Sequence, residues 1–122
     1  MKYMVMMFGD QASMVESRSR EWILEMVDFM GTVSDDLTKS GELVSAEGLA
    51  DATQATVVSI QNGIPVATDG PFAESKESLA GYWIVDVASE ARAIEFASYI
   101  VAFTEGPIEL RQIMDGPPEE YR

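Results

Sequence analysis

Two segments that lie far apart in the chain are almost continuously apolar. They are Tyr3–Phe8 and Leu79–Val87. A short uninterrupted apolar run is typical of a β-strand whose two faces are both covered, and neither run approaches the roughly 18 apolar residues of a membrane span. At 122 residues, the chain is expected to form a single domain, residues 1–122, with one core. Any fold proposed for it must cover both faces of these two strands.

A long amphipathic helix is predicted between the two apolar strands, ending at Ser40. Two starting points fit the sequence: Ser13, where Glu16 completes a capping box, and Ser19. Gly41 is the expected stop, because helices commonly end at a glycine in the left-handed conformation. The apolar residues that recur at helical spacing are Trp22, Ile23, Met26, Val27, Met30, Val33 and Leu37.

The rest of the chain predicts one more helix and four more strands. Asn62-Gly63, between two apolar runs, indicates a β-hairpin, and Pro65 restricts its second arm to an edge position. Ser89 fits the N-cap of the second helix, which is expected to end before Gly106-Pro107. The four strands are expected over Leu43–Leu49, Thr56–Gln61, Ile64–Thr68 and Ile108–Met114.

This order of elements predicts an α+β fold of the ferredoxin-like split βαβ type with an added β-hairpin. Both helices would cover one face of a mainly antiparallel sheet, and the other face of such a sheet is ordinarily polar. Here the strands are apolar on both faces, so a homodimer built sheet against sheet is expected. The alternative is a strongly coiled sheet that closes over its own face.

The composition excludes several kinds of chemistry. The chain has no cysteine and no histidine, which removes thiolate and imidazole nucleophiles, the usual neutral-pH general base and most transition-metal sites. Eight basic against 21 acidic side chains give a net charge of -13, which disfavours nucleic acid and anionic membranes as partners. We expect a cytoplasmic protein without metal or cofactor, and we interpret the eight methionines as adaptable core filler.

The segment ATDGPFAESKE is the first candidate site. Asp69-Gly70-Pro71 has turn chemistry, and Asp115-Gly116-Pro117 repeats it after the last predicted strand, so these residues are interpreted chiefly as a turn. Phe72, Glu74 and Lys76 come after the first tripeptide, and the second has no counterpart to Phe72. These three are either a ring anchored on the core and a solvated segment, or binding residues that line a cleft.

A second group of candidates comes from the strands. Glu47 interrupts a stretch suited to burial, and Glu109 and Arg111 are two residues apart and therefore share a sheet face. We hypothesise a partly buried site in which Glu47 and Asp69 act as catalytic acid or base and Arg111 binds an anionic group, with Tyr82 as a further binding residue. The alternatives are a cross-strand salt bridge and, for Tyr82, core packing.

A family resemblance is carried by five segments in order along nearly the whole chain: MKYMVMMFGD, GELVSAEGL, TDGPFAESKE, GYWIVDV and IELRQIMD. Together they resemble the YCII-related family, in its DGPF-domain branch. The resemblance implies a dimeric α+β barrel of ferredoxin-like protomers with a cleft beside the dimer interface. It also implies a link to sigma factors of the extracytoplasmic-function type, near which family members are often encoded. A histidine-aspartate mechanism suspected in the wider family is not expected here, because histidine is absent.

Two functions remain open, and the missing histidine slightly favours the first of them. The first is a homodimeric module that binds a small anionic or polar ligand or regulates a sigma-factor system. The second is a histidine-independent enzyme of lyase, isomerase or hydrolase type that uses carboxylates in a cleft near the dimer interface.

Overall fold

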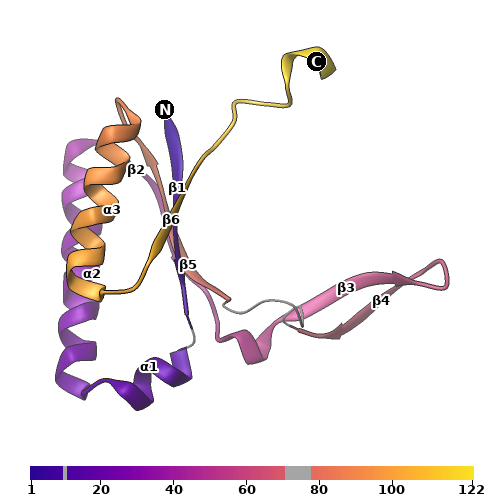
Figure 1. The fold of residues 1–122 in the computed structure, drawn as a ribbon, viewed down its shortest axis with the longest axis horizontal. Coiled ribbons are helices and arrows are strands. Elements are labelled where there is room, and N and C mark those ends of the chain that lie inside the picture. Colours follow the sequence, from indigo (N-terminus) through magenta and orange to yellow (C-terminus); the bar gives the residue numbers. More distant parts are fainter. Residues whose placement is uncertain (10, 71–77) are drawn as a thin grey trace.

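The chain forms a four-stranded antiparallel sheet with its helices on one face (Figure 1). The computed structural model describes residues 1–9, 11–70 and 78–122. The strand order is β2-β5-β1-β6, which is the order of a split βαβ fold and confirms the predicted α+β class. The strands are β1 (Lys2–Phe8), β2 (Leu43–Gly48), β5 (Leu79–Asp86) and β6 (Ile108–Gln112).

The predicted first helix is divided into α1 (Gln11–Ser17) and α2 (Arg20–Ser40). Ser19 is the N-cap of α2, and its side chain accepts a hydrogen bond from the Trp22 amide at 3.1 Å. The capping box proposed at Ser13 is therefore wrong, because Ser13 lies inside α1. Gly41 ends α2 in the left-handed conformation, as expected. No helix among the described residues is long and apolar enough to cross a membrane.

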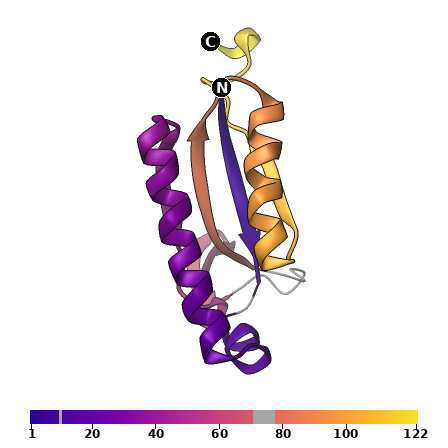
Figure 2. The same ribbon diagram turned by 90° about the vertical axis from the view of Figure 1, so that its left-hand side faces the viewer.

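The helix α3 (Glu90–Thr104) confirms the second predicted helix. Its N-cap is Ser89, which accepts a hydrogen bond from the Arg92 amide. Figure 2 shows α2 and α3 lying side by side across the strands. The buried core lies between these helices and the sheet, and its members are Tyr3, Val5, Val33, Leu37, Trp83, Val85, Val87, Ala93, Phe96, Ala97 and Ile100.

The added hairpin consists of β3 (Thr56–Gln61) and β4 (Ile64–Asp69), which form a separate two-stranded sheet. Asn62 and Gly63 both have positive φ, as a type I′ turn requires. A 3₁₀ turn precedes β3 at Ala52–Gln54, and another ends the chain at Glu119–Tyr121. In Figure 1 the hairpin projects away from the helices, on the side of the sheet that the helices leave uncovered.

That uncovered side, which we call the open face, is apolar at its centre. Val5 and Trp83 belong to the core, so their neighbours Met4, Met6 and Ile84 point to the opposite face. None of the described helices covers this face (Figures 1 and 2). The sheet is not closed into a barrel, because β2 and β6 stand at opposite ends of the strand order. Within one chain Met6 is nevertheless only 9% exposed, and Met4 and Ile84 are partly buried.

An ion pair fastens α3 to the connection between α2 and β2. Arg92 Nε donates to Glu42 Oε2 at 2.9 Å, and Arg92 Nη2 donates to Glu42 Oε1 at 2.8 Å. These bonds, together with a hydrogen bond from Ser40 Oγ, outweigh the cost of partial burial and hold the pKa of the Glu42 carboxyl below its usual value. Glu95 also contacts Arg92, but it is far more exposed than Glu42.

We predict that Glu42→Gln lowers the free energy of unfolding at pH 7 by about 1–2 kcal/mol, because a bidentate charged contact is lost. A carboxyl whose pKa is lowered by folding stabilises the protein above its unfolded pKa, and this contribution disappears as the pH falls through its folded pKa. Urea unfolding at pH 7 and at decreasing pH should therefore show the difference between variant and parent shrinking in acid. Glu95→Gln is the matched control and should cost about 0.5 kcal/mol or less.

Candidate functional site

A hollow lies between α2 and one end of the sheet, because the strands there carry very small side chains. Gly48 on β2 pairs with Gly81 on β5, and Ala46 and Ala80 complete the floor. A Cβ atom at Gly81 would lie 2.9 Å from the carbonyl oxygen of Glu47. The close approach of the two strands therefore demands glycine at Gly81, and the same absence of a side chain leaves room above the sheet.

Methionines form the walls of this hollow. Met7 comes from β1, Met14 from α1, and Met26 and Met30 from α2. The cavity they enclose has a volume of about 330 Å³. Unbranched thioether side chains adjust their shape easily, so they suit a site that must fit closely around a small apolar group.

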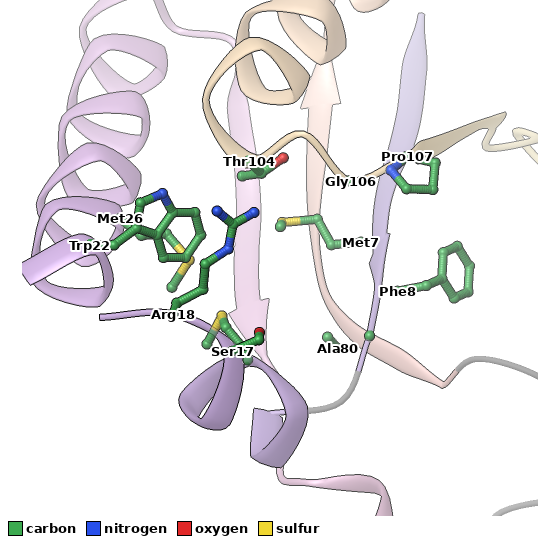
Figure 3. Close-up of a pocket in the computed structure, with 12 residues that line it drawn as sticks. Met7, Phe8, Ser17, Arg18, Trp22, Met26, Ala80, Thr104, Gly106 and Pro107 are labelled. Atoms are coloured by element: carbon green, nitrogen blue, oxygen red, sulfur yellow. The ribbon is translucent and has the colours of Figure 1, made fainter. Parts of the chain in front are cut away.

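A second cavity of about 270 Å³ borders the first (Figure 3). The two cavities share the lining residues Met7, Met14, Met26 and Ala80, so they are neighbours. Each lies near the lower end of the range of about 300–1,000 Å³ that is typical of small-ligand pockets. The second cavity is also lined by Phe8, Gly9, Ser17, Arg18, Trp22, Thr104, Gly106 and Pro107.

Arg18 supplies the positive charge of the second cavity. Its guanidinium lies over the ring of Trp22, 4.4 Å from the ring centroid, and points into the pocket between Trp22 and Met7 (Figure 3). The carboxylate of Glu105 lies 3.8 Å from Arg18 Nη2 and is largely exposed to solvent. This contact is too long for a hydrogen bond, so it leaves donor capacity on the guanidinium.

Thr104 adds a polar atom without a partner. Its Oγ1 is buried and makes no hydrogen bond to any described residue, although Thr104 lines the same cavity as Arg18. Buried polar atoms are nearly always hydrogen-bonded, so this hydroxyl is an exception, but it is buried from the cavity as well as from solvent. Among the residues that the structure describes, no cluster of three or more acidic side chains could hold a metal ion.

Three of the residues predicted for the site lie on the open face instead. Tyr82 follows Gly81 and precedes the core residue Trp83, so its side chain points away from the helices. Glu47 pairs with Tyr82 and therefore shares this face, although both residues also border the larger cavity. Arg111 pairs with Met4 on the same face.

The residues proposed for the catalytic site do not lie close together within one protomer. Glu47 and Arg111 are on the two edge strands with two strands between them, a separation of about 14 Å at ordinary strand spacing. Asp69 ends β4 on the separate hairpin. Arg111 contacts Glu109 at 3.5 Å on the exposed surface. Both residues belong to β6, so this salt bridge lies within one strand and is not the cross-strand bridge given as the alternative.

The loop of the first candidate site is described only at its start. Gly70 has no positive φ, and a Cβ atom there would lie 3.0 Å from Val57 Cγ2 and 3.2 Å from Ala55 Cβ. Tight packing against the base of the hairpin therefore favours glycine at this position. The binding residues predicted beyond it, Phe72, Glu74 and Lys76, lie outside the described residues.

Sequence reasoning missed the site between α2 and the sheet. The methionines were interpreted as core filler, and Arg18 and Thr104 were not singled out. The available signal was the cluster of small residues in two strands, Ala46 with Gly48 and Ala80 with Gly81, at a position where bulky side chains would otherwise fill the core. That signal becomes specific only when the pairing of Gly48 with Gly81 is known.

Comparison with known proteins gives two matches. The family model described as the YCII-related domain matches residues 1–116. An uncharacterized protein of Rhizobium meliloti (strain 1021) is 31% identical over 97 residues, which cover 80% of this chain and 77% of that protein.

We predict opposite effects on stability for two glycine substitutions. Gly81→Ala should lower the free energy of unfolding by about 1–3 kcal/mol, because the new methyl group meets the Glu47 carbonyl and must push β2 away. Gly31→Ala, in the interior of α2 with no atom within 4 Å of the new Cβ, should raise it by about 0.5–1 kcal/mol. Denaturant unfolding of both variants measures the difference, and equal effects would contradict the role given to Gly81.

Proposed function

Because the chain belongs to the YCII-related family, we propose that it is a homodimeric protein that binds a small ligand between α2 and the sheet. The observation that carries this proposal is the pair of neighbouring methionine-lined cavities, of which the larger lies above Gly48 and Gly81. A domain of this size ordinarily fills such space with side chains. Here the strand residues Gly48 and Gly81 are too small to fill it, and the methionine side chains around them can adjust to a ligand.

The dimeric part of the proposal is supported by the open face. Met4, Met6 and Ile84 form an apolar centre there that no described helix covers. The hairpin projects on the same side and exposes further apolar side chains, among them Val58 and Ile60. A second copy seated against the open face would cover this centre and lie beside the hairpin.

Catalysis by carboxylates and a link to a sigma factor are secondary parts of this proposal. A catalytic role for Glu47 and Asp69 would need the second copy to bring them together, because one protomer holds them on separate sheets. The proposed link to a sigma factor is supported by the family resemblance alone. Ligand binding in the cavity is favoured over both, since it uses residues that already converge in one chain.

We predict that thermal-shift screening against a metabolite library will find compounds that raise the melting temperature, because a ligand selective for the native state stabilises it. Ala80→Leu should abolish these shifts, since Ala80 borders both cavities and a larger side chain would fill them. Arg111→Ala and Asp69→Asn should leave them unchanged. Shifts lost in these two variants, but kept in Ala80→Leu, would move the binding site to the open face and the hairpin.

We also predict that light scattering will give the mass of a dimer at micromolar concentration. Ile84→Asp should convert the dimer to a monomer, because it places a charge at the apolar centre of the open face. Val27→Asp is the matched control: Val27 is an exposed apolar residue on α2, and its replacement should leave the mass unchanged. A monomeric parent protein would contradict the proposed interface.

A further inference from the structure

We propose that the ligand of this cavity is a small amphipathic monoanion, with its apolar body among the methionines and its anionic group at Arg18. This inference rests on the proposed ligand-binding function and adds the chemical class of the ligand. It is drawn from two features of the second cavity: an oriented guanidinium and apolar walls (Figure 3).

The guanidinium of Arg18 is held in place by its stacking on Trp22. Stacking engages the face of the planar group and leaves its N–H edge available for a carboxylate or a similar anion. Among the described residues, the acidic partner of Arg18 is Glu105, at 3.8 Å and with a side chain 76% exposed. Such a contact is weak in water, so an anion within the cavity can compete with it.

Thr104 also lines this cavity, but its hydroxyl is not part of the proposed anion site. Its Oγ1 is buried and has no partner among the described residues. An atom that solvent cannot reach is not open to the cavity either, so the anionic group of the ligand is assigned to Arg18 alone.

The apolar lining of the cavity and the net charge of the chain indicate the chemical nature of the rest of the ligand. Met7, Met14, Met26, Trp22 and Pro107 offer apolar contacts to the body of the molecule. The chain carries a net charge of -13, which repels anions in proportion to their charge. A single negative charge on an apolar body therefore fits better than a polyanion such as a nucleotide.

Octanoate, an aliphatic carboxylate, is the probe, and octanol is its neutral counterpart. Isothermal titration calorimetry of the full chain should show octanoate binding about tenfold or more tightly than octanol. Methyl NMR of methionine localises the probe: the signals of Met7, Met14 and Met26 should shift, whereas those of Met4 on the open face should not. Equal affinity for both probes would overturn the assignment of an anion.

Three substitutions then test the individual contacts. Arg18→Gln should weaken octanoate binding about tenfold. Thr104→Val should leave octanoate affinity within about twofold of the parent, because the buried Oγ1 that it removes is not open to the cavity. Glu105→Gln should strengthen binding, since it removes the competing carboxylate.

The matched controls are Arg20→Gln and Thr32→Val, which make the same chemical changes at residues outside both cavities. They should leave octanoate affinity within about twofold of the parent. Equal losses in Arg18→Gln and Arg20→Gln would show a general charge effect and refute the site. If neither probe binds while library compounds still depend on Ala80, the ligand class is wrong and the cavity remains the binding site. If nothing binds at all, both proposals fail.

Discussion

The antiparallel pairing of β1 with β5 at the centre of the sheet is the constraint on which the rest of the structure depends. Both strands carry apolar side chains on their two faces, so each face of the pair must be covered. On one face α2 and α3 supply that cover with buried side chains such as Val33 and Ile100. On the other face no described helix does so, and the apolar side chains there are the physical basis for proposing a second copy.

The cavity arises where this cover is incomplete. Gly81 has no side chain because β2 approaches too closely, and Gly48 beside it has none either. The helices pass above this gap, and methionines from three elements surround it without filling it. A Cβ atom at Gly81 would obstruct β2, and the same atom would occupy part of the cavity. The close spacing of these two strands therefore also leaves room for the proposed binding site.

Much of the fold was predictable from local sequence. The hairpin turn at Asn62-Gly63, the helix stop at Gly41 and the cap at Ser89 result from the conformations that these residue types favour, and all three were confirmed. The start of α2 was predicted as one of two alternatives, since serine followed by glutamate fits a capping box at Ser13 as well. The family resemblance was also correct, and it depended on several segments in order.

By itself, the sequence determined the types of the elements, their order, the absence of histidine and cysteine chemistry, and the shared sheet face of Glu109 and Arg111 through the alternation of strands. Only the tertiary structure decided that Glu47 and Arg111 stand at opposite edges, and that Arg18 and Thr104 line one cavity although they lie far apart in the chain. The physical reason is that local preferences fix the direction of a side chain within its own element. Proximity between elements depends on strand order and on packing, which no short stretch of sequence contains.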